Sequence, residues 1–280
     1  MKETHYPLGH EADEIERLNK QAVLLHDPYL DQLARASQTC LEIGCGVGSN
    51  LPLLRSANAK LHYTGIDIAK KAIETAQSFY QKDKHANFIT MNATDIRLDV
   101  EFDLIFTKLV LWSIGPTWQE VIINASRLLK PGGVFYALEP CNQLIHFYPP
   151  KPLTSKWMRI WDEAILQSGL NTYIGTEIAK ELILNQFQHV SASFFPVYSL
   201  GNNKEKYTAI INNLKGFYLG KSITELSLNM ADEDKTNITR ELESYNEHHF
   251  VMDALYRTVG HQGNRGSCRN LKDSLLKFVS

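Results

Sequence analysis

The stretch Thr39-Cys-Leu-Glu-Ile-Gly-Cys-Gly-Val-Gly-Ser-Asn50 decides the fold that we predict for this chain. Short apolar residues lead into three glycines at alternate positions, which indicates a buried strand that ends in a tight loop before a helix. Gly44, Gly46 and Gly48 have no Cβ, so they allow a sharp turn and let a bound molecule approach the main chain. Such a turn is typical of a nucleotide-binding site, but its spacing leaves the ligand open.

The acidic residue Glu42, just before the glycines, narrows the choice of ligand. A dinucleotide fingerprint would place a third glycine where this chain has Ser49, and a carboxylate at the strand end would repel a pyrophosphate. S-adenosylmethionine carries a sulfonium and an α-ammonium group and has no phosphate. Glu42 and the glycine loop therefore favour S-adenosylmethionine over NAD, with a purely steric role of the glycines as the simpler alternative.

Composition sets broad limits on the class of protein. A chain of 280 residues with 44% hydrophobic residues is long enough for one large domain or one and a half. The net charge of −2, without an extended Lys/Arg cluster, argues against a nucleic-acid partner. The four scattered cysteines predict neither a metal site nor a disulfide framework. Without a secretion signal or a membrane-spanning apolar run, we expect a cytoplasmic protein with no membrane partner.

Apolar runs alternate with amphipathic segments between Cys40 and Leu138, which predicts a parallel sheet with helices on both faces. Helical periodicity over residues 9–35, broken at Asp27-Pro28, predicts two helices before the first strand. Helices are also expected from Gly48 and from Pro116 to Leu128, with Lys130 complementing the dipole of the second of these. The expected strands cover residues 41–43, 61–66, 87–91, 102–106, 134–138, 188–200 and 250–259, and the expected helical inserts cover residues 141–185 and 203–245.

Polar residues at the predicted strand ends form a candidate site, because ligands of open α/β sheets lie outside the carboxyl ends of the strands. Asp67 ends the second strand and suits the ribose hydroxyls, although it could instead cap the next helix. Asn92 and Ala93 end the third strand and suit the adenine, although turn chemistry alone also favours Asn there. Lys108 ends the fourth strand, and we expect its ammonium to point away from a sulfonium, because like charges repel.

Four segments resemble the motif series of class I S-adenosylmethionine-dependent methyltransferases over residues 39–140. They are Leu41-Glu-Ile-Gly-Cys-Gly-Val-Gly, Gly65-Ile-Asp67, Phe102-Asp-Leu-Ile-Phe and Leu128-Leu-Lys-Pro-Gly-Gly. A narrower likeness, to a branch that includes quinone-biosynthesis and natural-product methyltransferases acting on small molecules, lies in Gly9 to Gln21, Glu139, Phe147-Tyr-Pro149, Trp161 and Ile174-Gly175. The resemblance implies a doubly wound, mostly parallel seven-stranded Rossmann-like sheet with an antiparallel last strand. It also implies that an N-terminal helical lid and helical inserts cover the acceptor pocket.

The resemblance also implies a division of the chain and a set of cofactor contacts. The division gives an N-terminal helical lid at 1–38, a cofactor-binding core at 39–140, the rest of the sheet with substrate-side inserts at 141–260, and a tail at 261–280. The predicted contacts are Glu42, Gly44, Cys45, Gly46, Asn50, Asp67, Ile68, Asn92, Ala93, Thr94, Lys108 and Leu109. Two positions depart from the family pattern: Asn92 replaces an aspartate, and Leu111-Trp112-Ser113 replaces Leu-Glu-His, which removes a potential catalytic base.

Methyl transfer is an in-line displacement, so holding donor and acceptor in line and excluding water can supply much of the catalysis. A general base is optional, and His10, His146 and Glu139 are weak candidates for one. Each also has a structural explanation: His10 as a surface residue of the lid, His146 as a polar group near aromatic residues, and Glu139 as a hydrogen-bonding partner. The aromatic residues Phe147, Tyr148, Trp157, Trp161 and Tyr173 could line an acceptor site or simply form core.

The resemblance predicts an enzyme that transfers the methyl group of S-adenosylmethionine to a small acceptor, aromatic or apolar, and releases S-adenosylhomocysteine. A non-catalytic S-adenosylmethionine-binding protein is the alternative from another class, favoured by the missing histidine. An NAD-linked oxidoreductase is the alternative among enzymes, opposed by Ser49 and Glu42. The acceptor itself is left open.

Overall fold

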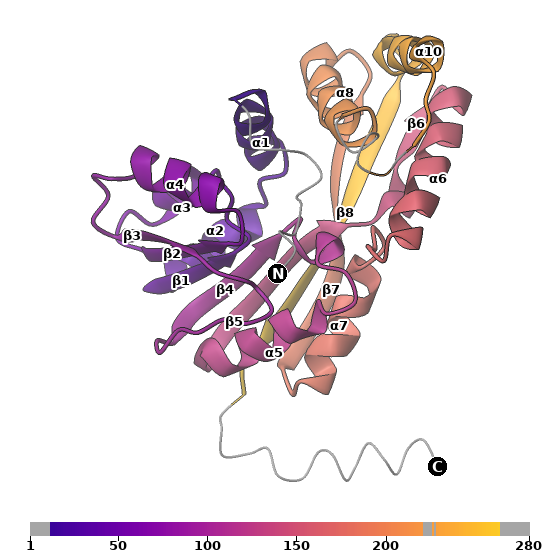
Figure 1. Cartoon of the computed structure of the whole chain (residues 1–280). Helices are drawn as coiled ribbons and strands as arrows, with labels where there is room; N and C mark the ends of the chain where they lie inside the picture. The colour runs from indigo at the N-terminus through magenta and orange to yellow at the C-terminus, as the bar shows by residue number, and fades with distance from the viewer. Residues whose placement is uncertain (1–11, 221–225, 227, 264–280) are drawn as a thin grey trace, which may run out of the picture.

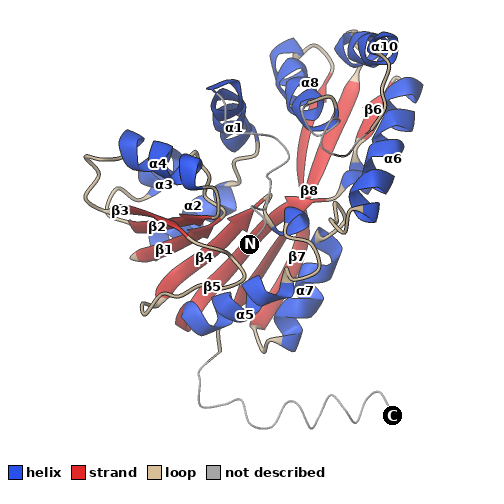
Figure 2. Ribbon diagram, viewed as in Figure 1, coloured by secondary structure: helices blue, strands red, loops and turns tan. Residues whose placement is uncertain are grey.

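The computed structural model describes residues 12–220, 226 and 228–263, so His10, Cys268 and most of the predicted tail lie outside the described residues. Helices cover both faces of a central sheet (Figures 1 and 2). The strands are β1 (Thr39–Ile43), β2 (His62–Asp67), β3 (Ala86–Thr90), β4 (Phe102–Lys108), β5 (Leu129–Pro140), β6 (His146–Tyr148), β7 (Gln188–Leu200) and β8 (Phe250–His261). The α-helices are α1 (Ala12–Leu24), α2 (Pro28–Ala36), α3 (Leu51–Ala57), α4 (Lys70–Phe79), α5 (Gln119–Leu128), α6 (Pro152–Gln167), α7 (Gly175–Leu184), α8 (Lys204–Tyr218) and α10 (Asp232–Glu243), and two 3₁₀ turns, η1 (Leu111–Ser113) and η2 (Asn142–Leu144), follow β4 and β5.

The strand order β3-β2-β1-β4-β5-β8-β6, with β7 paired to the other edge of β8, confirms the predicted doubly wound fold. Strands β1 to β5 are parallel, and β8 runs antiparallel to β5. Helices α3, α4 and α5 connect β1 to β2, β2 to β3 and β4 to β5, whereas a loop without a helix connects β3 to β4. The order reverses between β1 and β4, which places the carboxyl ends of these two strands at the topological switch point. The chain leaves β1 at this point through the glycine loop.

The described part of the sheet has eight strands, whereas seven were predicted. The additional strand is β6, in a segment that we expected to be helical. Strand β5 pairs with residues 255–261 of β8, and β6 continues the same edge by pairing with residues 250–252. Because β8 extends past β5, its backbone groups there need another partner, and the segment after β5 supplies it. Figure 1 shows α6, α8 and α10 around this extension of the paired strands β7 and β8.

Three element boundaries differ from the sequence prediction for local reasons. Helix α3 begins at Leu51 rather than at Gly48, because Gly48 has φ +79° and belongs to the turn. Helix α5 begins at Gln119 rather than at Pro116, since a turn bonds the Trp118 amide to the carbonyl of Gly115 at 3.2 Å. Strand β5 extends from Leu129 to Pro140, beyond the predicted 134–138.

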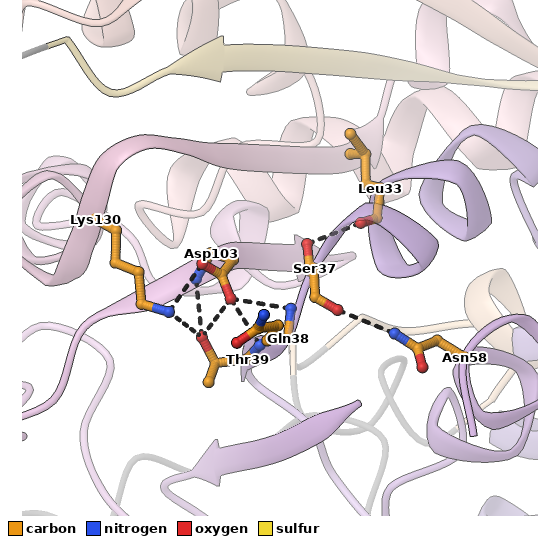
Figure 3. A network of polar contacts seen from close by, with 7 residues as sticks. All are labelled: Leu33, Ser37, Gln38, Thr39, Asn58, Asp103 and Lys130. Carbon is orange, nitrogen blue, oxygen red and sulfur yellow. Dashed lines mark hydrogen bonds and ion pairs between the residues drawn. The ribbon is translucent and has the colours of Figure 1, made fainter. Parts of the chain in front are cut away.

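The lysine after α5 makes contacts that the sequence did not predict. The Lys130 ammonium donates to Asp103 Oδ1 at 2.8 Å and to Thr39 Oγ1 at 3.2 Å (Figure 3). Asp103 Oδ2 accepts the backbone amides of Gln38 and Thr39 at 3.0 and 2.8 Å. This network joins the amino-terminal ends of β1 and β4, at the end of the sheet opposite the glycine loop, and so helps to fix their register. No helix among the described residues is long and apolar enough to cross a membrane.

Candidate active site

A cavity of about 320 Å³ lies at the carboxyl ends of β1, β2 and β4, where the sheet topology places a ligand site. Its floor includes the glycine loop, and its other walls come from α1, η1 and Phe217 of α8. Helix α1 is joined to α8 by the Gln21 Nε2 to Asn213 Oδ1 hydrogen bond of 2.9 Å. All twelve residues predicted as cofactor contacts line this cavity.

The three glycines of the loop serve different purposes, although each has a positive φ. A Cβ on Gly44 would lie 2.4 Å from a Val110 methyl group, and one on Gly48 would lie 2.9 Å from the Phe88 ring. A Cβ on Gly46 would meet no atom within 4 Å. Gly44 and Gly48 are therefore required by packing, whereas Gly46 leaves open space in the cavity wall, as close approach of a ligand requires.

Glu42, the last but one residue of β1, is 1% exposed and accepts two hydrogen bonds. Asn50 Nδ2 donates to Oε1 at 2.6 Å, and the Tyr63 hydroxyl donates to Oε2. Burial raises the pKa of Glu42 to about 7, against the opposing effect of these two bonds. A cation next to Glu42 would stabilise the carboxylate, as the sequence prediction of a cationic ligand requires.

The side chain of Lys108 lies in the wall of the cavity, and the expectation that its ammonium points away from a sulfonium stays a prediction. Its ammonium donates to Asn50 Oδ1 and to the Ala22 carbonyl of α1, both at 3.1 Å. Burial lowers the pKa of Lys108 to about 8, although nearby Glu42 opposes this change. The ammonium therefore lies beside the hydrogen-bonded pair of Asn50 and Glu42, a contact that the sequence did not predict.

Asp67 and Asn92 both bind neighbouring backbone. Asp67 Oδ2 accepts the Gly46 amide and Oδ1 accepts the Ala69 amide, both at 2.8 Å, so it ties the loop after β1 to the loop after β2. Each carboxylate oxygen can accept a further bond, so a ribose contact stays a prediction. Asn92 Oδ1 accepts the amide and the hydroxyl of Thr94, both at 2.9 Å. This oxygen is therefore used by the turn, which favours the turn explanation over the predicted adenine contact.

Two of the three weak candidates for a general base, Glu139 and His146, do not line the cavity. Glu139 is fully buried on β5, where its Oε1 accepts the amides of Val110 and Leu111 at 3.0 and 3.1 Å. Burial raises its pKa to about 7, and these amide bonds oppose the rise. His146 is exposed on β6, with its ring 6.1 Å from that of Phe250, and it does not line the cavity. His10 lies outside the described residues.

The aromatic wall of the cavity comes from other residues than those predicted. Trp112 and Phe217 line the cavity, with ring centroids 5.2 Å apart, and the Trp112 indole donates to the Leu109 carbonyl at 2.9 Å. Of the predicted aromatic residues, Trp157 and Trp161 are buried in the core and Tyr148 is 59% exposed on β6. Trp112 was noted only as a departure from the family pattern, and the sequence of α8 contains no signal that singles out Phe217.

Comparisons with known proteins agree with this geometry. The family described as a methyltransferase domain matches residues 41–137, from β1 into β5. Residues 41–137 thus form a methyltransferase domain, and this match supports a class I S-adenosylmethionine-dependent enzyme. The cofactor of this methyltransferase is S-adenosylmethionine, as predicted. An uncharacterized methyltransferase of Synechocystis sp. is 29% identical over 157 residues, which are 54% of this chain and 69% of that protein.

Two further similarities bear on the acceptor and on the fold. The tRNA N(3)-methylcytidine methyltransferase of Schizosaccharomyces pombe is 29% identical over 129 residues, 42% of this chain and 42% of its own length. The YcgJ protein of Bacillus subtilis superposes with a TM-score of 0.53 at 17% identity, over 86% of this chain and 99% of its own, which shows the fold. The expectation that nucleic acid is excluded as a partner is not supported, because the first of these relatives is named for a tRNA substrate.

The residues of the cavity fit S-adenosylmethionine. The open space at Gly46 admits a ligand next to the main chain, and the buried hydroxyl of Ser49 has no hydrogen-bond partner among the described residues. Ser49 lines the same cavity as Glu42, which supplies a negative group for a cationic ligand. When bound, the cofactor supplies an electrophilic methyl group on a sulfonium.

Proposed function

We propose that this protein transfers the methyl group of S-adenosylmethionine to a small-molecule acceptor by in-line displacement. The observation that carries the proposal is the cover over the site. Helix α1 and Phe217 of α8 lie over the carboxyl ends of the strands and leave a cavity of about 320 Å³. This volume is in the range of pockets that hold small ligands. A macromolecular acceptor would have to insert a single side chain or nucleotide, whereas a small molecule can enter whole.

The acceptor end of the cavity is mostly apolar. Trp112 and Phe217 form an aromatic wall, and Leu18 and Ile114 add aliphatic surface. This lining favours an aromatic or apolar acceptor, which can stack on the rings and lose little hydration on entry. We further propose the predicted division of labour, in which the lid at 1–38 and the inserts within 141–260 cover the acceptor while 39–140 binds the cofactor.

Positioning is the main catalytic device in this proposal. The described cavity residues include no histidine, and their carboxylates, Glu42 and Asp67, lie at the glycine loop. An acceptor that ionises readily, such as a phenol or a thiol, needs no base from the protein. The walls then hold the nucleophile in line with the methyl group and keep water out.

The experiment that tests the function tracks the methyl group. The full chain is incubated with S-adenosylmethionine labelled in the methyl group, with phenols, thiols and amines of one or two rings, and separately with tRNA and capped mRNA. We expect label in a small molecule, equimolar S-adenosylhomocysteine, and loss of both with Asp67→Ala. Label in RNA would contradict the proposed acceptor class. S-adenosylmethionine binding without any transfer would favour the non-catalytic alternative.

A further inference from the structure

The wall of the cofactor cavity contains a partly buried ammonium group whose hydrogen bonding is incomplete. Lys108 Nζ donates to Asn50 Oδ1 and to the Ala22 carbonyl, both at 3.1 Å. An ammonium has three N–H groups, and the third finds no acceptor among the described residues. Both acceptors are neutral, and Glu42 and Asp27 attract the ammonium only through space. A cation taken from water without a charged hydrogen-bond partner is costly. The site therefore favours an anion next to Lys108.

A negative group occupies the same wall, and one amide connects the two charges. Asn50 accepts from Lys108 through Oδ1 and donates to Glu42 Oε1 through Nδ2 at 2.6 Å. The Tyr63 hydroxyl holds the other oxygen of Glu42. The amide of Asn50 thus fixes the orientation of both charged groups and keeps them from collapsing into a direct ion pair. The result is a cation, Lys108, and an anion, Glu42, side by side on one face of the cavity.

This arrangement matches a zwitterion of the amino-acid type, in which an ammonium and a carboxylate are carried by one carbon atom. S-adenosylmethionine ends in such a group. We propose that Lys108 binds the α-carboxylate of S-adenosylmethionine, while Glu42 faces the α-ammonium. The inference rests on the cofactor site and deepens it, because it assigns the ammonium of Lys108 to a named group of the ligand. It also keeps Lys108 at the amino-acid end, away from the sulfonium that it would repel.

The second hydrogen bond of Lys108 gives the assignment a structural consequence. The Ala22 carbonyl belongs to α1, which covers the cavity, so the same ammonium contacts both the cofactor carboxylate and this helix. Ala22 is 5% exposed at this contact. Binding of the carboxylate favours the protonated form of Lys108, which is the form that donates to α1. Closure of the cavity is in this way linked to the presence of the cofactor.

The test compares two ligands that differ only in the carboxylate. The affinities of the full chain for S-adenosylmethionine and for decarboxylated S-adenosylmethionine are measured by isothermal titration calorimetry at pH 7, without acceptor. A hydrogen bond to a charged group contributes about 1.5–3 kcal/mol, or about 10–100-fold in affinity. We expect the wild type to prefer S-adenosylmethionine by about this factor, Lys108→Met to lose the preference, and Lys108→Arg to retain part of it.

The control is Lys71→Met, because Lys71 is an exposed lysine of α4 that does not line the cavity. This variant should bind both ligands as the wild type does. Equal weakening of both ligands by Lys108→Met would show a structural role and overturn the proposal, as would a wild type that does not distinguish the ligands. Lys108→Arg, which keeps a cation, provides the same comparison if Lys108→Met does not fold.

Two remaining outcomes have separate meanings. If Lys108→Met leaves both affinities unchanged, Lys108 does not bind the cofactor carboxylate and the proposal fails. An anionic acceptor would then be tested with the same variant. If the folded wild type binds neither ligand, the cofactor site itself is refuted together with the proposed function. Binding with an unaltered preference in Lys108→Met refutes only the role of Lys108.

Discussion

Substitution of Gly46 separates ligand binding from folding more cleanly than any other change in the glycine loop. Gly46 has φ +53°, lines the cavity, and has no atom within 4 Å of the position that a Cβ would take. Gly46→Ala therefore creates no clash within the protein. Its methyl group instead occupies the open space that we assign to the cofactor. The matched change is Gly44→Ala, whose Cβ would lie 2.4 Å from Val110 Cγ2.

The expected magnitudes depend on these contacts. An alanine in the left-handed region costs about 1 kcal/mol in the free energy of unfolding, which lowers the melting temperature by about 2 °C in a domain of this size. Gly44→Ala adds overpacking to the same backbone strain and should cost about 3 kcal/mol or more. For ligand affinity, we expect Gly46→Ala to weaken S-adenosylhomocysteine binding at least tenfold, or about 1.4 kcal/mol.

The assay combines thermal unfolding measured by circular dichroism with calorimetric titration of S-adenosylhomocysteine. Gly46→Ala should be folded, slightly less stable and weak in binding, whereas Gly44→Ala should mainly lose stability. Binding of S-adenosylhomocysteine to Gly46→Ala with wild-type affinity would refute the assignment of the open space to the cofactor. A loss of stability as large as that of Gly44→Ala would refute the interpretation of Gly46 as open cavity wall.

Three further predictions concern other parts of the molecule. Burial raises the pKa of Glu139 from 4.5 to about 7, so its stabilising contribution is present below pH 4.5 and is lost as the pH rises to about 7. Urea unfolding should show that the free energy of unfolding falls by about 3 kcal/mol over this pH range in the wild type and not in Glu139→Gln. The contribution of Asp103 to stability has the opposite pH dependence: burial raises its pKa, but bonds from Lys130 and Thr39 outweigh that effect and lower it. Its contribution is therefore present above pH 3.8 and is lost in acid, so Asp103→Asn should flatten the loss of stability between about pH 5 and 2. An unchanged acid-unfolding curve would show that the network in Figure 3 does not contribute. Phe217→Ala should raise the acceptor KM about tenfold, through about 1.5 kcal/mol of lost apolar contact, and leave the S-adenosylhomocysteine Kd unchanged; an effect on the Kd alone would place Phe217 at the cofactor instead.

The sequence by itself determined the features that depend on neighbouring residues and on the rule of parallel strands. The glycine pattern with Glu42 predicted the turn after β1, and residues at the ends of predicted strands predicted the cavity wall, including Asp67. This worked because parallel strands bring their carboxyl ends to one edge of the sheet, so separate strand ends become neighbours without any knowledge of side-chain packing. The predicted cofactor and class of enzyme depended on these local signals.

Only the tertiary structure decided which side chains meet across elements distant in the chain. Strand β6 forms because β8 extends past β5, and Phe217 reaches the cavity because the helical insert that carries it folds back over α1. Glu139 was removed as a base by three amides of the loop after β4, and Lys108 was turned toward Asn50 and the Ala22 carbonyl. The hydrogen bonds among these contacts join residues 27 to 192 positions apart, which no local pattern encodes. The acceptor wall is built from such contacts, whereas the cofactor loop is built from adjacent residues.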